Sequence, residues 1–157
     1  RILIVDFDAH HGNGTQNFFY EDNEVFFISI HQRDIYPHNG NRDQFGAKRG
    51  ESYTLNIPLN PGSGLADIKN ELSDETLNRL TNWAPEVLLF SAGFDAHEED
   101  TISQLTLKSS DYYELTRVFM NLLPGKTTPI ISFLEGGYNL HALSESVYYH
   151  LKALRDD

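Results

Sequence analysis

The chain has 157 residues, with 23 acidic against 12 basic side chains, and its formal net charge of −11 disfavours a nonspecific grip on nucleic-acid phosphate. Cysteine is absent, which excludes disulfide bonds and thiolate metal sites, so any metal must be held by histidine and carboxylate groups. The length suits one domain, residues 1–157, and no apolar run approaches the roughly 20 residues that span a bilayer, so we expect an intracellular, cytoplasmic protein with no membrane or nucleic-acid partner.

Short apolar runs mark the expected strands. Four of them are almost continuously apolar, as strands buried on both faces of a parallel sheet should be. A fifth alternates between apolar and polar residues, which indicates a place nearer an edge. The continuous runs are 2–5, 25–30, 87–90 and 129–134, and the alternating one is 54–59.

Helical patterns separate the later strands. Leucine and isoleucine recur at helical spacing over 65–80 and stop before Pro85, a second pattern begins at Asp111 and runs over 112–122, and a third covers 143–154. Alternation of strands and helices predicts an α/β fold with a mainly parallel sheet flanked by helices. The stretch 31–52 has little periodicity, and loops of that length are functional or disordered.

Polar residues follow the first run, where ligands gather in such sheets. Side chains alternate in an extended segment, so Asp6, Asp8 and His10 start on the same side. An isolated Asp-x-Asp is more often a polar turn, but Asp-x-Asp-x-His-His predicts a metal site.

Two further segments lie just past strands. Asp95 follows the run 87–90 and is a candidate third ligand, although an aspartate there could equally be a helix cap. Gly136 and Gly137 follow the last run and let the backbone bend, so that Tyr138 could donate to a developing oxyanion; half-buried packing is the more common role of such a tyrosine.

Three segments together resemble the signature blocks of the histone deacetylase and acetylpolyamine amidohydrolase superfamily, in order and in spacing. They are DFDAHHGNGTQ, SAGFDAHEED and LEGGYNL, at 6–16, 91–100 and 134–140. Asn13 resembles the class II and bacterial branch, and Ile102 stands where polyamine-selective eukaryotic enzymes carry an acid. The resemblance implies an arginase/deacetylase-like fold, of which this chain is the C-terminal part, incomplete at its N-terminus.

The resemblance also implies roles for individual residues. Asp8, His10 and Asp95 fall on the ligands of one zinc ion, and Tyr138 on the tyrosine that polarises the acetyl carbonyl. An acetylated amine, on a protein lysine or a small molecule, would be hydrolysed to acetate and free amine. The other positions are an inner monovalent cation site, usually for potassium, at Asp6, Ser29 and Ile30; an outer one at Phe19, Asp22, Val25 and Tyr53; a substrate tunnel at Tyr36, Pro37, Ile102, Gly136 and Gly137; and supporting positions behind the metal at His11 and Asn13.

The family's general base belongs to a His-His pair upstream of the first strand, and this chain has no equivalent pair apart from His10 and His11. We therefore expect a fragment, inactive or nearly so by itself. Other histidines (His31, His38, His97, His141 and His150) are expected on the surface or in loops.

Three alternatives remain. An arginase or agmatinase type ureohydrolase would need a second acid where Gly12 stands, and a phosphatase would not place Ala9 and His10 after its aspartates. A noncatalytic module that binds an acetylated ligand predicts metal binding without acetate release.

Overall fold

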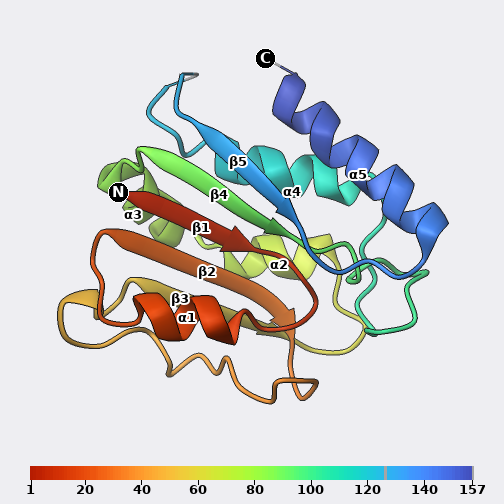
Figure 1. Cartoon of the computed structure of the whole chain (residues 1–157), viewed down its shortest axis with the longest axis horizontal. Helices are drawn as coiled ribbons and strands as arrows, with labels where there is room; N and C mark the ends of the chain where they lie inside the picture. Colours follow the sequence, from red (N-terminus) through yellow and green to blue (C-terminus); the bar gives the residue numbers. More distant parts are fainter. Residues whose placement is uncertain (126, 157) are drawn as a thin grey trace.

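The computed structural model describes residues 1–125 and 127–156, and its centre is a five-stranded, all-parallel sheet (Figure 1). The strand order is β3-β2-β1-β4-β5. This confirms the predicted α/β class with a parallel sheet. The strands are β1 (Ile2–Asp6), β2 (Val25–Gln32), β3 (Thr54–Leu59), β4 (Val87–Ala92) and β5 (Ile130–Leu134).

Five α-helices and one short 3-10 helix connect the strands. The helix α1 lies on one face of the sheet, over β2, while α2, α3 and α4 lie behind it, and α5 packs along α4 (Figure 1). The main core forms between the sheet and this second group of helices, around side chains such as Phe90, Leu115 and Phe119. The helices are α1 (Asn13–Phe19), α2 (Leu65–Glu71), α3 (Asp74–Trp83), α4 (Asp111–Met120) and α5 (Leu140–Arg155), and the 3-10 turn η1 is Lys48–Gly50.

Two helical expectations need correction. The stripe over 65–80 is two helices, because the chain leaves helical geometry at Leu72 and the hydroxyl of Ser73 accepts the amide of Thr76 to start α3. The helix α1 was not predicted, since its sequence NGTQNFF carries one glycine, two asparagines and few apolar residues. Among the described residues, no helix is long and apolar enough to cross a membrane.

The edge strands differ from the expectation in opposite ways. The strand β3 lies at an edge, as predicted, yet five of its six residues are buried. The strand β5 was expected to be buried on both faces, and this is wrong: Phe133 is 56% and Leu134 65% exposed. Parallel strands are usually covered on both faces, so β5 presents an uncovered apolar surface in this chain.

The expectation of a surface or loop position is confirmed for His38 and His141, which are exposed. Three other histidines are buried: one of them, His97, still lies in a loop, as expected, and the expectation is wrong for the two that lie in β2 and α5. His150 on α5 is 2% exposed, and its ring nitrogens lie 2.7 Å from Thr116 Oγ1 and 2.9 Å from Ser132 Oγ. Burial lowers the pKa of His150 to about 4. The helix α5 is thus fastened to α4 and β5 by a neutral imidazole. The other two are His31 and His97.

This imidazole predicts a loss of stability in acid. An unfolded histidine has a pKa near about 6.5, so between pH 6.5 and about 4 the unfolded chain binds a proton that folded His150 does not. The free energy of unfolding should therefore fall as the pH is lowered through this range, by at most about 1.4 kcal/mol per pH unit for this residue.

Urea denaturation at several pH values tests this. His150→Gln should show a shallower fall between pH 6.5 and 4 than the unaltered chain. His141→Gln, on the exposed side of the same helix, should leave the fall unchanged because that side chain is solvated in both states. Parallel curves for all three proteins would contradict the prediction.

Candidate metal centre

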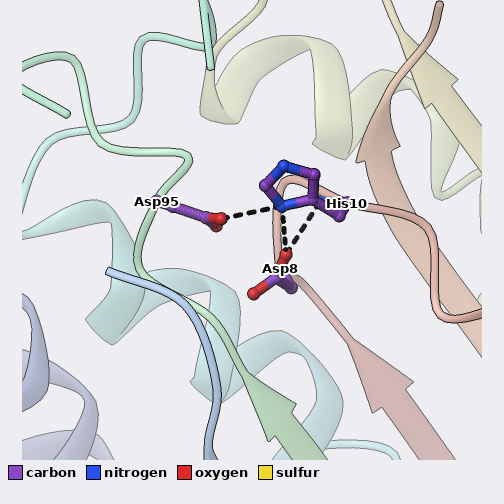
Figure 2. A group of neighbouring side chains, drawn as sticks. All are labelled: Asp8, His10 and Asp95. Atoms are coloured by element: carbon purple, nitrogen blue, oxygen red, sulfur yellow. Dashed lines mark hydrogen bonds and ion pairs between the residues drawn. The ribbon is translucent and has the colours of Figure 1, made fainter. Parts of the chain in front are cut away.

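The first and fourth strands deliver the candidate ligands to the carboxyl end of the sheet. Since β1 and β4 are parallel neighbours, with Asp6 level with Ser91, the residues that follow them leave the sheet side by side. Asp8, His10 and Asp95 converge there (Figure 2), and one ligand atom from each lies within 4.8 Å of the others. The predicted trio is therefore brought together.

Backbone amides orient both carboxylates. Asp95 Oδ1 accepts the amide of Ala9 at 2.8 Å, and Asp8 Oδ2 accepts the amide of Gly136 at 2.9 Å. The ring of His10 completes the group, with Nδ1 at 2.9 Å from Asp8 Oδ1 and 3.0 Å from Asp95 Oδ2. The second contact is an ion-pair distance without hydrogen-bond geometry, so Asp95 Oδ2 is a buried oxygen with no donor in the described chain.

The electrostatics of the trio favour a cation. Asp95 is 0% exposed, and burial first and Asp8 second raise its pKa to about 6. Burial, then Asp8, also raises the pKa of Asp6 well above its ordinary value. Buried carboxylates at close range are stable as charged groups only when a cation compensates them.

A zinc ion fits these residues. Zinc takes nitrogen and oxygen ligands at about 2.0–2.2 Å in a tetrahedron, which implies ligand atoms about 3.3 Å apart. The contacts of His10 Nδ1, at 2.9 and 3.0 Å, are close to that spacing, and the donorless Asp95 Oδ2 supplies an unused ligand. Three protein ligands would leave a fourth position for substrate, as at catalytic zinc.

Glycines allow the close approach of three segments. A Cβ on Gly136 would lie 2.6 Å from Asp95 Oδ2 and 2.7 Å from Asp8 Oδ2, and a Cβ on Gly93 only 2.4 Å from Asp8 Cα. At each of these three distances the neighbouring atom would have to move. The glycines that the sequence suggested for backbone bending thus also leave room for the carboxylates.

A cavity of about 470 Å³ opens over two members of the trio, Asp8 and His10, while Asp95 lies beneath its lining. Gly136 and Tyr138 line it together with Asp8 and His10, while Tyr36, Pro37, Ile102 and Gly137 are not among its lining residues. Tyr138 is 60% exposed; desolvation first, and then Asp95 and Asp8, raise the pKa of its phenol, which is therefore protonated at neutral pH. The catalytic and tunnel roles remain predictions.

His11, Ser29 and His31, next to the candidate metal site, form a series of hydrogen bonds that the sequence did not reveal. Ser29, level with Asp6 on the neighbouring strand, places its Oγ 3.0 Å from His11 Nδ1 and 2.9 Å from His31 Nδ1. His31 Nε2 in turn lies 3.1 Å from the carbonyl oxygen of Gly40 in the long loop. Burial lowers the pKa of both imidazoles to about 4, so they bond as neutral rings. These hydrogen bonds connect the long loop at Gly40 to the segment that carries the candidate metal ligands.

The other predicted positions lie near the trio with simpler contacts. Asp6 Oδ1 accepts the amide of Asp8 at 3.1 Å, Ile30 lies within β2, and Asn13 begins α1. Asp100, a residue to which the sequence assigned no role, accepts the amide of Tyr138 at 2.7 Å. The only signal for it was its place inside the block at 91–100.

Comparisons with known proteins agree with this geometry. The model of the histone deacetylase domain matches residues 1–154. "Histone deacetylase 14, chloroplastic" of Arabidopsis thaliana is 40% identical over 98% of this chain and 37% of its own length, and "Acetylpolyamine amidohydrolase 1" of Pseudomonas aeruginosa is 39% identical over 91% and 41%. The crystal structure of the HDA15 HD domain superposes with a TM-score of 0.89 at 34% identity, over 98% of this chain and 44% of that one.

The chain therefore spans less than half the length of these relatives. The family match removes the support for a ureohydrolase or a phosphatase, and the fold is of the arginase/deacetylase type seen in these neighbours. With its predicted motifs gathered at one edge of a parallel sheet, the chain belongs to the histone deacetylase family of hydrolases.

Proposed function

We propose that this chain carries the metal half of a zinc-dependent deacetylase site that acts on an acetylated amine. The main support for this proposal is the trio of Asp8, His10 and Asp95. Among the described residues, the buried Asp95 Oδ2 has no hydrogen-bond donor. Relatives named histone deacetylase and acetylpolyamine amidohydrolase support the substrate class, an acetylated lysine or polyamine.

The chain's own residues have distinct tasks in this proposal. Asp8, His10 and Asp95 hold the ion, and Lewis-acid polarisation of the acetyl carbonyl would be supplied at this position by bound zinc. Tyr138 lines the same cavity and has a protonated phenol, so it can donate to the carbonyl oxygen as negative charge develops there.

The described residues offer no imidazole that is well placed as a general base. His11 lines the cavity, but its Nδ1 is bonded to Ser29, its Nε2 is buried without a partner, and burial lowers its pKa to about 4. We propose that the base comes from residues outside this chain. The 157-residue chain should then bind zinc yet release little acetate, which is also what a noncatalytic acetyl-binding module would do.

A monovalent cation, potassium by resemblance, is proposed at Asp6, Ser29 and Ile30. The support is Asp6 itself, a buried acid that is 5% exposed and has no basic partner among the described side chains. Potassium chloride should raise the melting temperature more than tetramethylammonium chloride at equal ionic strength. Equal effects of the two salts would contradict this part of the proposal.

One set of measurements separates the two functions. Calorimetric titration of the 157-residue chain should show one zinc site, which Asp8→Ala removes. In the full-length protein, acetate release from an acetyl-lysine peptide or an acetylated polyamine should require zinc and Asp8. Tyr138→Phe should keep zinc affinity and slow the reaction by roughly 100-fold or more, as loss of an oxyanion donor does. A full-length protein that binds zinc and an acetylated ligand without releasing acetate would instead be a binding module.

A further inference from the structure

Asp100 is a buried carboxylate that binds backbone amides from two distant segments. It is 7% exposed, its Oδ2 accepts the amides of Tyr138 at 2.7 Å and Asn139 at 3.1 Å, and its Oδ1 accepts the amide of Ile102 at 3.0 Å. Among the described residues, no Lys, Arg or His side chain pairs with it. Its charge is therefore stabilised by amides alone, next to the N-terminus of α5.

The segment that carries Tyr138 is held on both sides of Gly137. On one side the amide of Gly136 binds the metal-ligand carboxylate of Asp8, and the carbonyl of Gly136 accepts the amide of Phe94 at 2.7 Å. On the other side, the amides of Tyr138 and Asn139 donate to Asp100 Oδ2. Gly137 lies between them with φ of +143°, a conformation that glycine adopts readily.

The side chain of Tyr138 has no comparable restraint. It is 60% exposed, and within residues 1–125 and 127–156 no group is hydrogen bonded to its hydroxyl. The position of the phenol over the cavity thus depends on how firmly its own backbone is held. Of the two restraints, only the Asp100 carboxylate acts directly on the amide of Tyr138.

The bonds from Asp100 are not needed to cap α5. Asn139 caps that helix with its own side chain, which accepts the amides of His141 and Ala142, and its Nδ2 donates to the carbonyl of Glu99 at 2.9 Å. Removing the charge of Asp100 should therefore leave α5 in place. What changes is the restraint on Tyr138.

We infer that Asp100 is a positioning residue that fixes Tyr138 relative to the metal ligands, a role that rests on the proposed function. Asp95 and Asp100 belong to the same connection between β4 and α4, and the carbonyl of Asp95 accepts a hydrogen bond from Ser103 Oγ at 2.7 Å. One loop therefore supplies both a metal ligand and the anchor of Tyr138. This loop thus fixes the backbone of Tyr138 relative to the candidate ligand Asp95.

The test variant is Asp100→Asn, which keeps the shape but replaces one acceptor oxygen with an amide. In the 157-residue chain, exchange of the Tyr138 and Asn139 amide hydrogens should quicken by roughly 10-fold or more, since hydrogen bonds to a charged group are stronger than to a neutral one. Zinc affinity should stay within about 2-fold, because the ligands are untouched. Asp67→Asn is the matched control: its carboxylate accepts the amide of Gly64 at the start of α2 and is not bonded to Tyr138, Asn139 or a candidate metal ligand.

In the full-length protein, Asp100→Asn should lower kcat by roughly 10-fold or more at unchanged KM. In the Tyr138→Phe background the same change should have little further effect, because two residues that act as a unit are not additive. An equal further loss in that background, unchanged amide exchange, or a matching loss of zinc affinity would each overturn the inference. If the unaltered protein releases no acetate while Asp100→Asn still quickens exchange of the two amides, the result would count against the proposed function alone.

Discussion

Asp95→Asn is expected to abolish zinc binding and, at the same time, to make the metal-free chain more stable. The carboxylate of Asp95 is fully buried, and burial together with Asp8 raises its pKa to about 6, so at pH 7 it is ionised at a cost. Asparagine has the same shape and can keep the Oδ1 bond to the amide of Ala9. It removes the charge and can donate toward the oxygen atoms and ring nitrogen beside it.

The expected sizes follow from the charge. A pKa raised from 3.8 to about 6 corresponds to a penalty on the order of 3 kcal/mol on the ionised carboxylate, which the variant relieves near pH 7. The gain should be greatest above pH 6 and should vanish below about pH 4, where aspartate is protonated in the folded and unfolded chains alike. Loss of a supporting group behind a metal ligand costs about 10–100-fold in affinity, so loss of a ligand should exceed 100-fold.

Urea denaturation with and without zinc measures both effects. With a chelator, Asp95→Asn should unfold at higher urea than the unaltered chain; with zinc in excess, the order should reverse, because only the unaltered chain gains binding energy. Asp67→Asn, at an exposed helix start, should follow the unaltered chain in both conditions. If Asp95→Asn is less stable in chelator, the carboxylate is compensated within the chain and the metal interpretation weakens.

Gly136→Ala is expected to destroy the zinc site with a single methyl group. The new Cβ would lie 2.6 Å from Asp95 Oδ2 and 2.7 Å from Asp8 Oδ2, so both candidate ligands must move. Side-chain ends can move at low cost, and we expect the metal-free chain to lose only about 1–3 kcal/mol. Zinc affinity should fall by more than about 100-fold, because ligand geometry is what the methyl group disturbs.

Gly14→Ala is the control for this variant, because Gly14 lines the same cavity and a Cβ there meets nothing within 4 Å. It lies in α1, where alanine is favoured over glycine by about 1 kcal/mol, so the control should be slightly more stable with unchanged zinc affinity. Calorimetric zinc titration of both variants decides the matter. Tight zinc binding by Gly136→Ala would show that the two carboxylates do not form the site together.

Much of the fold could be predicted from the sequence because the apolar runs are strong local signals. Each of the five runs became a strand, and the alternating run at 54–59 became an edge strand. Local signals failed where competing local bonds decide the outcome. Ser73 starts a new helix with its hydroxyl, and this interrupts a stripe that is continuous in its apolar spacing.

Burial of the polar residues could not be predicted because it depends on neighbours from distant segments. His31, His97 and His150 look like ordinary loop or surface residues in the sequence, yet each is at most 4% exposed. The uncovered surface of β5 is the opposite case, since nothing in the run 129–134 distinguishes it from the buried strands. Which residues are covered is a property of the packed molecule.

The sequence by itself determined the candidate ligands and the apolar runs that they follow. Asp-x-Asp-x-His, and Asp95 two residues after Gly93, are local patterns at the ends of these runs. The tertiary structure decided how these residues act on one another. Parallel pairing of β1 with β4 places Asp8 beside Asp95. Burial first, and then the nearby Asp8, raises the pKa of Asp95, and one of its oxygens has no donor among the described residues. The anchoring of Tyr138 by Asp100 joins residues 38 positions apart, a distance at which no sequence periodicity operates.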